Sequence, residues 1–270
     1  MPEGTDRSTD IIVSPANPGI KMTRSLQRRK NRLQERAFVV EGIRAVNDVL
    51  AAGIRPRAVY LREDADRGQL EHIPADVTIR RVASRVFDDL TDVAHPQGVL
   101  AVVPMLGDAA FPDVAGRPLV MILDAVRDPG NLGTLLRSAA GAGVDHVVIG
   151  PESVDPYHPR AVRAAMGAHL RVPFSRRSWA DLARLIDHFP IVALADADGD
   201  TTYDALTWTD AAAIIVGGEA FGPSSAAYEC ATHRVSIPLA NGVESLNAGV
   251  AGSLLAFEAA RQRRSANGRA

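Results

Sequence analysis

The chain has 270 residues, of which 46% are hydrophobic and 23% charged, and its formal net charge at pH 7 is −2. This is the composition of one large or two ordinary globular domains, and it excludes a protein that is basic over its whole surface. One cysteine rules out a framework of intrachain disulfides and a cysteine metal cluster, and no apolar run approaches the roughly 18 residues that span a bilayer, so we expect a cytoplasmic protein.

The first forty residues contain a concentrated basic stretch. Residues 1–10 are polar, and we expect a disordered tail. From Pro18 to Arg36 the pattern predicts a helix with sparse apolar positions at Ile20, Leu26 and Leu33. The thirteen positions 24–36 include only one acid, which indicates either a surface for nucleic acid or a solvated arginine-rich helix. The basic residues there are Arg24, Arg28, Arg29, Lys30, Arg32 and Arg36.

The remainder of the first half alternates short strands and helices. An apolar stripe of Val46, Val49 and Leu50 marks one helix, and Ser84 is the expected N-cap of the next. Such alternation predicts a parallel or mixed α/β sheet, here as a small domain over residues 12–104. The expected strands are 37–40, 58–61, 77–82 and 98–103, and the expected helices are one that begins at residue 41 or 42 and ends at 52, and one over 84–90.

A proline- and glycine-containing linker, residues 105–117, separates this half from a second α/β domain, residues 118–264. The apolar runs of the second domain are stronger than those of the first. The expected strands are 119–123, 146–149, 191–195, 213–216 and 234–237, and the expected helices are 129–142, 159–166, 179–188 and 247–264.

The first candidate loop of the second domain follows its first strand. Asp128 is suited to cap the next helix and Pro129 to occupy its first position. Arg137 shares a helix face with Gly130 and Gly133, which leaves space beside a long cation. This pattern indicates a ligand contact, or else an ordinary surface arginine.

The second candidate loop runs from Gly217 to Ser224. It nearly matches the phosphate loop G-x-x-x-x-G-K-[ST], but Pro223 stands where that loop requires lysine, which excludes a triphosphate site of this kind. Its glycines permit a sharp turn that brings backbone N–H groups and Glu219 close to a ligand. Open α/β sheets bind ligands at such carboxyl ends of strands.

The third candidate loop leads into a helix of small residues. Ser245 and Asn247 are hydrogen-bonding residues at its start, and no charge follows before Glu258. We therefore expect its first two turns to be packed on most sides. A buried helix with a polar start is either a ligand site or an ordinary capped core helix.

Taken together and in order, the three loops resemble the motifs of the SpoU branch of the SPOUT superfamily, the S-adenosyl-L-methionine (AdoMet)-dependent RNA ribose 2′-O-methyltransferases. The motif positions are Asn131 with Arg137, Gly217-Gly218-Glu219 with Gly222, and Ile237-Pro238 with Ser245-Leu246-Asn247. The basic helix followed by Phe38-Val39-Val40-Glu41-Gly42 is similar to the small ribosomal-protein-like RNA-binding domain that often precedes this catalytic domain.

The resemblance implies a C-terminal trefoil-knotted α/β domain with a mostly parallel sheet, AdoMet as methyl donor without a metal, and a homodimer. The implied catalytic residues are Asn131, Arg137, Glu219, Ser245 and Asn247. The implied cofactor-binding residues are Leu194, Ala195, Gly217, Gly218, Ile237, Leu246 and Asn247. The expected RNA-binding residues are Arg24, Arg28, Arg29, Lys30, Arg32 and Arg163.

Two details qualify these roles. The resemblance implies that Arg137 is the base and acts on RNA beside the AdoMet of the other subunit. A guanidinium group resists deprotonation, however, so we expect Arg137 to bind the adjacent phosphate and stabilise the developing alkoxide. After Asn247 the family continues Val-Ser-Val or Val-Ala-Val, whereas this chain has Ala248-Gly249-Val250, whose smaller side chains permit a closer neighbour.

The substrate is therefore expected to be structured RNA read largely by shape. Ribosomal RNA of the large subunit is favoured over tRNA, because relatives with this kind of N-terminal domain mostly act there. The sequence leaves open whether the protein is a housekeeping enzyme or one that confers thiopeptide resistance. A non-catalytic RNA-binding protein on the same scaffold is the alternative from another class.

Overall fold

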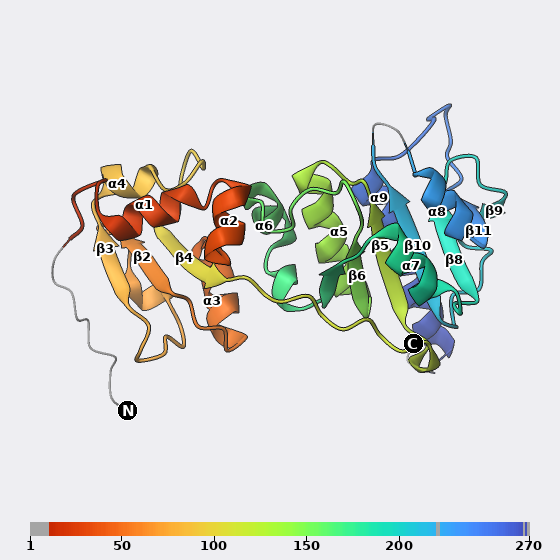
Figure 1. The fold of residues 1–270 in the computed structure, drawn as a ribbon, viewed down its shortest axis with the longest axis horizontal. Coiled ribbons are helices and arrows are strands. Elements are labelled where there is room, and N and C mark those ends of the chain that lie inside the picture. The colour runs from red at the N-terminus through yellow and green to blue at the C-terminus, as the bar shows by residue number, and fades with distance from the viewer. Residues whose placement is uncertain (1–10, 220–221, 267, 269–270) are drawn as a thin grey trace. The chain divides into compact units, whose positions relative to one another are not determined.

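The computed structural model describes residues 11–219, 222–266 and 268, so the expected tail at 1–10 lies outside the described residues. The chain divides into two compact units (Figure 1). Unit 1 comprises Met1–Leu106 and Tyr157–Arg163, and unit 2 comprises Gly107–Pro156 and Ala164–Ala270. The segment 157–163, expected in the second domain, thus clusters with unit 1. Among the described residues, no helix is both long and apolar enough to cross a membrane.

Unit 1 is built on a four-stranded mixed sheet in the order β1-β4-β2-β3 (Figure 1). Strand β4 runs antiparallel to β1 and β2, whereas β2 and β3 are parallel. The core on one side joins α1 and α4 to the sheet through Ile20, Phe87, Tyr60 and Leu100. The strands are β1 (Ala37–Glu41), β2 (Ala58–Arg62), β3 (Ile79–Val82) and β4 (Val99–Pro104), and the helices are α1 (Pro18–Ser25), α2 (Arg29–Glu35), α3 (Ile43–Ala51) and α4 (Ser84–Asp88).

The single helix expected over 18–36 is wrong: α1 and α2 are separated by residues 26–28. Leu26 is buried, but Leu33, expected on the apolar side, is 50% exposed. The reason for the break is Arg32, which is 1% exposed and donates from Nη1 to the carbonyl oxygens of Leu26 and Gln27, at 2.8 Å each. These carbonyls have left the helical ladder, and the guanidinium satisfies them.

The expected N-cap of α4 is also wrong, because the cap position is Ala83 and carries no side-chain hydrogen bond. Ser84 instead donates to Glu63 Oε1 from its backbone nitrogen, at 2.8 Å, and from its hydroxyl, at 2.9 Å. The stripe of α3 is as expected, with Val46, Val49 and Leu50 buried.

Unit 2 contains a seven-stranded sheet in the order β7-β6-β5-β10-β8-β11-β9, and every neighbouring pair is parallel. The expected α/β fold with a mostly parallel sheet is confirmed, while the trefoil knot stays a prediction. The strands are β5 (Leu119–Asp124), β6 (His146–Ile149), β7 (Phe174–Arg176), β8 (Ile191–Ala195), β9 (Thr201–Thr202), β10 (Ala212–Gly217) and β11 (His233–Ser236). The helices are α5 (Pro129–Ala142), α6 (Pro159–Ala165), which crosses the unit boundary, α7 (Trp179–Ile186), α8 (Ser225–Cys230) and α9 (Ala248–Ala266).

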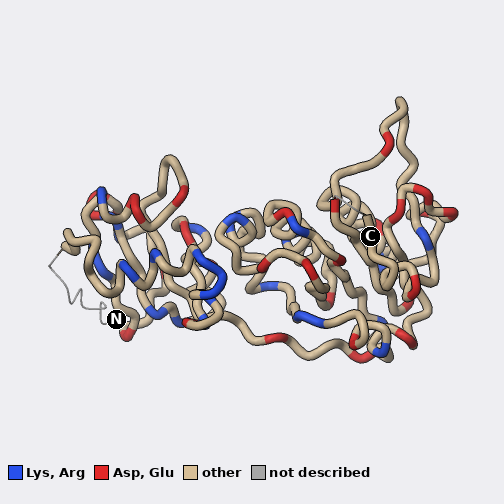
Figure 2. Tube along the Cα trace, turned by 45° about the horizontal axis from the view of Figure 1, so that its top comes forward, with Lys and Arg blue, Asp and Glu red and all other residues tan. Residues whose placement is uncertain are grey.

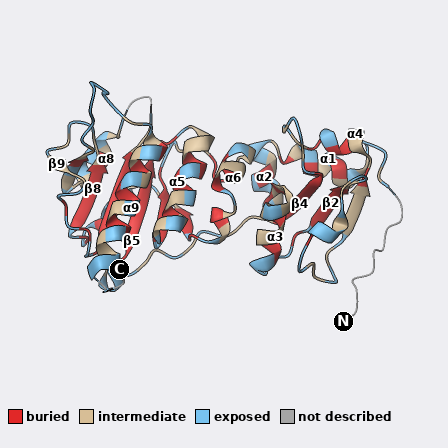
Figure 3. Cartoon of the chain, turned by 180° about the vertical axis from the view of Figure 1, so that it is seen from behind, coloured by how far each residue is buried: buried red, intermediate tan, exposed pale blue. Residues whose placement is uncertain are grey.

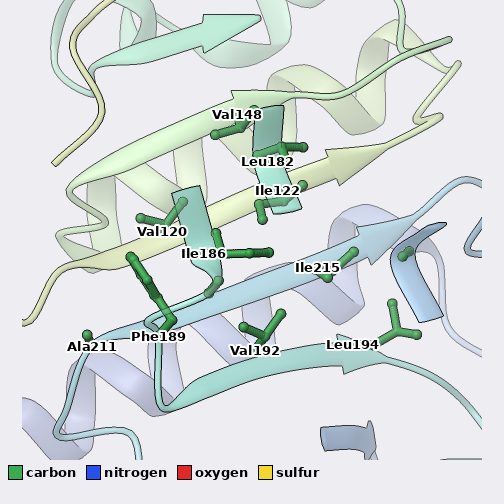
Figure 4. Packing of buried hydrophobic residues seen from close by; sticks show 12 residues of the cluster. Val120, Ile122, Val148, Leu182, Ile186, Phe189, Val192, Leu194, Ala211 and Ile215 are labelled. Atoms are coloured by element: carbon green, nitrogen blue, oxygen red, sulfur yellow. The ribbon is translucent and has the colours of Figure 1, made fainter. Parts of the chain in front are cut away.

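Helices cover both faces of this sheet, with α7 and α8 on one face and α5 and α9 on the other (Figures 1 and 3). On the first face Leu182 and Ile186 of α7 pack against Ile122, Val148 and Ile215 (Figure 4). The near-continuous apolar strands of a parallel sheet require this cover on both sides. Strands β7 and β9 and helix α8, which are short, were not expected from the sequence.

Helix α9 is packed on one side only. Gly252 approaches so closely that a Cβ atom there would lie 2.4 Å from Leu135 Cδ2 of α5 and 2.8 Å from Val216 Cγ2 of β10. The opposite side is exposed and apolar (Figure 3), with Val250 46%, Leu254 38% and Phe257 47% exposed. The expectation that its first two turns are packed on most sides is therefore wrong for the outer face.

Candidate active site

A cavity of about 610 Å³ opens in unit 2 at the carboxyl ends of β8, β10 and β11. This is where open parallel sheets place ligands. Its walls come from the strand ends, from the Gly217–Ser224 loop and from the start of α9. The residues that surround it are Ala195, Asp196, Ala197, Val216, Gly217, Gly218, Glu219, Gly222, Pro223, Tyr228, Val235, Ile237, Leu239, Ser245, Leu246, Asn247, Ala248 and Ala251.

The glycines of the second loop bring its backbone against the first loop. A Cβ atom on Gly218 would lie 2.2 Å from the carbonyl oxygen of Ala125, so only glycine fits this approach. Ala125 itself has a φ of 54°, a left-handed conformation that is uncommon outside glycine. The two strand-end loops therefore meet backbone to backbone beside the cavity.

Asp124, at the end of β5, fixes this arrangement and was not identified from the sequence. Its carboxylate is 1% exposed and accepts from Trp179 Nε1 at 3.1 Å and from the backbone nitrogen of Ser224 at 2.6 Å. Ser224 is the N-cap of α8, so one buried carboxylate holds the second loop and the start of two helices. Ser224, which directly follows the cavity residue Pro223, is thereby held in place.

Three of the expected catalytic side chains meet at one edge of the cavity. Asn131, in the first turn of α5, donates from Nδ2 to Glu219 Oε1. Asn247 accepts from the backbone nitrogen of Val250 at 3.3 Å, which caps α9. A Cβ atom on Gly249 would lie 3.1 Å from Asn247 Oδ1 and 3.3 Å from Asn131 Oδ1, so the absence of a side chain at Gly249 lets the two amides approach each other.

Arg137 is not part of this cluster. It follows Asn131 by six residues on the same helix, which corresponds to about 9 Å along the axis and about 240° of rotation. Its guanidinium is exposed and donates from Nη1 to Met166 Sδ at 3.0 Å. Within one chain, therefore, Asn131, Glu219 and Asn247 do not hold Arg137 in place. Ser245, the remaining expected catalytic residue, is exposed and lines the cavity.

All but one of the expected cofactor-binding residues line the cavity. The residues that do so are Ala195, Gly217, Gly218, Ile237, Leu246 and Asn247. Leu194 does not, because side chains alternate across a strand and that of Leu194 is fully buried in the core cluster shared with α7 (Figure 4).

A second polar cluster, which was not identified from the sequence, lies at the other side of the cavity. Asp196 Oδ2 accepts from Arg234 Nε at 2.9 Å and from the Tyr228 hydroxyl at 3.1 Å. Burial alone would raise the pKa of Asp196, but hydrogen bonds from the Asp198 backbone nitrogen, Arg234 and Tyr228 together hold it below its ordinary value. Burial and the bond to Asp196 raise the pKa of Tyr228. The signal was present, because Asp196 directly follows a strand.

The expected RNA-binding residues of unit 1 divide into two groups. Arg24, Arg28, Arg29 and Lys30 are exposed on α1, α2 and the intervening turn, and this basic stretch can be followed in Figure 2. Arg32 is buried, as described above, and so does not belong to the exposed basic surface.

Arg163 is also engaged within unit 1. Its guanidinium binds Asp92 through two hydrogen bonds of 2.6 and 3.1 Å. Asp92 has its pKa lowered by that hydrogen bond, whereas burial raises the pKa of the nearby Glu41 despite its bond from Thr91. Contact of Arg163 with RNA would require this ion pair to be shared or broken.

The charge of the cavity limits what it can bind. Its described lining contains no lysine or arginine and two carboxylates, of which Asp196 is paired with Arg234 while Glu219 is bound by the neutral amide of Asn131. Such a lining disfavours a phosphate-bearing ligand and favours a cationic one. The apolar walls and glycine backbone supply the flat surface and close approach that a purine needs. A ligand that joins a nucleoside to a positive charge fits these residues.

Comparison with known proteins gives two family matches. Residues 118–257 match the SpoU rRNA Methylase family, and residues 17–101 match the MRM3-like substrate binding domain. The mouse protein named "rRNA methyltransferase 3, mitochondrial" is 31% identical, over 87% of this chain and 70% of its own length. The Bacillus subtilis protein named "23S rRNA (guanosine(2553)-2'-O)-methyltransferase RlmP" is 28% identical, over 91% of this chain and 97% of its own.

Solved structures agree with these matches. The crystal structure of an AdoMet-bound rRNA methyltransferase from Sinorhizobium meliloti superposes with a TM-score of 0.83 at 27% identity. The match covers 93% of this chain and 97% of that one, so it includes both units.

Proposed function

The chain belongs to the SpoU rRNA Methylase family, and we propose that it transfers the methyl group of AdoMet to a ribose 2′-OH of large-subunit ribosomal RNA. The observation that supports this function most directly is that the cavity adjoins a cluster of polar side chains. The cavity at the ends of β8, β10 and β11 ends at the edge where Asn131, Glu219 and Asn247 meet.

AdoMet fits the cavity by its chemistry. It consists of an adenosine and a methionine joined at a sulfonium ion, and it supplies an electrophilic methyl group when bound. Apolar side chains of Val216, Val235, Ile237 and Leu246 are suited to the adenine, and Glu219 contributes negative charge toward the sulfonium. A volume of about 610 Å³ lies within the range of small-molecule sites.

The residues of the polar cluster orient the acceptor. Asn131 and Asn247 offer amide groups, and Ser245 a hydroxyl, at the edge where the ribose would enter. Fixing the hydroxyl in line with the departing sulfur contributes several kcal/mol to the barrier reduction, by the general magnitude of such orientation effects. Arg137 would bind the neighbouring phosphate and stabilise the developing alkoxide through its five N–H donors.

A homodimer would complete the site. Arg137 lies apart from Asn131, Glu219 and Asn247 within one chain, so a partner must supply it if all four act on one ribose. The outer face of α9 supports this assembly: Val250, Leu254 and Phe257 recur at helical spacing on it and are exposed. Large exposed apolar residues on one face mark interaction surfaces.

Unit 1 is proposed to bind the RNA, with the catalytic domain extending over residues 118–264 and the RNA-binding domain over 12–104. The exposed Arg24, Arg28, Arg29 and Lys30 supply sequence-independent phosphate contacts. Ionic contacts of this kind position the substrate, and the cavity of unit 2 then defines the reacting nucleotide.

Mapping of 2′-O-methyl positions tests the function. RNA is isolated from cells with and without the intact chain, and one large-subunit ribosomal nucleotide is expected to lose its methyl group in the deletion strain and regain it on complementation. A change confined to tRNA would show that tRNA is the substrate instead of ribosomal RNA. Unchanged methylation in every RNA would contradict the proposed methyltransferase activity. If methylation is unchanged in every RNA, calorimetry with AdoMet then tests for a pure RNA binder, which would show no heat of binding.

A further inference from the structure

The second polar cluster of the cavity lies away from the reacting edge. Asp196 follows β8, Tyr228 belongs to α8 and Arg234 to β11, whereas Asn131 and Asn247 flank the start of α5 and α9. In the sheet β8 lies next to β10, and β11 lies beyond β8, with a spacing of about 4.8 Å between neighbouring strands, while Glu219 follows the end of β10. Asp196 and Tyr228 nevertheless line the same cavity.

The hydrogen bonds of Asp196 leave a defined acceptor. An ionised carboxylate offers about four lone-pair positions. Its Oδ2 accepts from Tyr228 at 3.1 Å and from Arg234 at 2.9 Å, and its Oδ1 accepts from the Asp198 backbone nitrogen at 3.1 Å. These three hydrogen bonds leave one lone-pair position on Oδ1. The Tyr228 oxygen donates its proton to Asp196 and can itself accept, so two acceptors stand side by side.

We propose that Asp196 and Tyr228 recognise the ribose diol of AdoMet, each accepting a hydrogen bond from one of the two vicinal hydroxyls. The inference rests on the proposed function, since it assigns a group of the same donor. A diol presents two adjacent O–H donors, which match two adjacent acceptors. A carboxylate at the end of a strand that binds a nucleoside ribose is also the arrangement of dinucleotide sites in open α/β sheets.

The charge around Asp196 indicates which group of AdoMet it binds, the neutral ribose diol or the cationic α-ammonium group of the methionine portion. Arg234 donates to Asp196 and also to the carbonyl oxygen of Asp198 at 3.2 Å, and its guanidinium lies 5.8 Å from the Tyr228 ring centroid. The carboxylate of Asp196, whose side chain is 9% exposed, is therefore already paired with a cation, the guanidinium of Arg234, whose side chain is 46% exposed. A neutral donor suits such a group better than a second cation. Arg234 is a positioning residue in this assignment.

The test is calorimetry on the full-length chain with S-adenosylhomocysteine and its 2′-deoxy and 3′-deoxy analogues. In the wild type, we expect loss of the recognised hydroxyl to weaken binding by roughly 10- to 100-fold, the usual effect of a hydrogen bond to a charged group. The Asp196→Asn variant should bind S-adenosylhomocysteine more weakly than the wild type by a similar factor. The deoxy analogue that lacks the hydroxyl recognised by Asp196 should then bind this variant about as well as S-adenosylhomocysteine does. Tyr228→Phe should remove the sensitivity to the other hydroxyl.

Asp181→Asn is the matched control, because Asp181 is an acid of α7 bound by Ser178 and Arg184 outside the cavity. A purely structural role of Asp196 would weaken parent and deoxy ligands by the same factor, and this outcome would overturn the assignment. So would coupling of Asp196 to the α-amino group, measured with the des-amino analogue. Should Asp196→Asn fail to fold, the Tyr228→Phe arm decides. Absence of any binding to the wild type would instead contradict the proposed function.

Discussion

The side-chain amide of Asn131 donates to the carboxylate of Glu219, joining two loops that lie 88 positions apart in the sequence. The bond is possible because Gly218 brings the loop after β10 against the backbone of Ala125. Asn131 also lies close to the start of α9, where a Cβ atom on Gly249 would be 3.3 Å from Asn131 Oδ1 and 3.1 Å from Asn247 Oδ1. One edge of a parallel sheet thus collects three loops into a single site.

Replacing Arg137 should separate chemistry from donor binding. Since Arg137 lies outside the described lining of the cavity, Arg137→Ala is expected to reduce methyl transfer by about 100-fold or more while AdoMet binds nearly as before. Transfer of a labelled methyl group and calorimetry measure the two effects. Arg137→Lys, which keeps the charge but not the planar donors, should rescue little. Normal turnover of Arg137→Ala would disprove the role.

A mixture of two inactive chains should recover activity. If Arg137 acts on the AdoMet of the other subunit, a heterodimer of Arg137→Ala with Asn247→Ala retains one complete site. Co-expression with different affinity tags isolates the heterodimer, whose methyl transfer is then compared with that of each mutant homodimer. Recovery is expected only in the heterodimer. Its absence in a folded heterodimer would place the two residues in the same chain's site.

The packing of Gly218 predicts a stability effect. Gly218→Ala places a Cβ atom against the carbonyl oxygen of Ala125, and because that atom belongs to the backbone the loop must move. We expect a loss of about 2 kcal/mol in the free energy of unfolding, together with weaker AdoMet binding. Chemical denaturation measures the first. Gly107→Ala is the control, since nothing lies within 4 Å of the added Cβ atom there and stability should not fall.

Buried histidine predicts the acid limit of stability. Burial, with a further contribution from Arg177, lowers the pKa of His146 to about 4, and its ring lies 2.8 Å from the Ser175 hydroxyl. An unfolded histidine titrates near 6.5, so the folded state binds fewer protons between these values. Stability is therefore complete above about pH 6.5 and is lost as pH falls toward 4, by an amount on the order of 3 kcal/mol. Burial of His169 lowers its pKa in the same direction.

Unfolding by urea at several pH values checks this dependence. The decline between pH 6.5 and 4 should be shallower for His146→Asn than for the wild type, since asparagine does not titrate. An identical slope in the two proteins would show that other groups control the acid limit.

The exposed basic residues of unit 1 should control the salt dependence of RNA binding. Neutralising Arg28, Arg29 and Lys30 to glutamine should lower the slope of log affinity against log salt by about one for each removed charge. Filter binding or fluorescence anisotropy measures the slope. Arg184, Arg261 and Arg264, exposed in unit 2, form the control triple, for which the slope should hardly change. An equal change of the salt slope in both triple variants would show that the basic surface of unit 1 has no particular part in RNA binding.

Arg32 should behave differently from its neighbours. Because it is buried and satisfies two carbonyl oxygens, Arg32→Gln is expected to lower the stability of unit 1 by about 2 kcal/mol rather than the salt slope. Thermal unfolding and the slope measurement together distinguish the two effects. A changed slope with unchanged stability would return Arg32 to the RNA surface.

Much of the second unit was determined by local sequence. The apolar runs of β5 and β10 and the helix from Pro129 to Ala142 were expected almost to the residue, because strand burial and helix caps leave direct signals in the chain. The resemblance of the loops to the SpoU motifs implied seven cofactor positions, and six of these residues line the cavity. The family followed from three short loops whose order and spacing are shared.

Other features depended on contacts between distant residues. The pair of Arg163 with Asp92 and the bonds of Asp196 to Tyr228 and Arg234 join residues far apart in the chain, so no local pattern gives these partners, although the place of Asp196 after a strand was a signal. The break near Leu26 and the burial of Arg32 depend on hydrogen bonds that Arg32 makes to carbonyls five and six residues earlier, which the apolar pattern does not reveal. The side chain of Leu194 is buried in the core and does not line the cavity, because the alternation of a strand does not say which face meets which layer, and its role in cofactor binding stays a prediction.

The helix of small residues shows the division most clearly. Sequence by itself predicted a helix of small residues with a polar start over residues 247–264, and the structure has it at Ala248–Ala266. Only the tertiary structure decided that Gly252 packs on Leu135 and Val216 while Val250, Leu254 and Phe257 are exposed. The physical reason is that residue size specifies how near a neighbour can come, whereas the neighbour on each face is selected by the whole sheet and its helices.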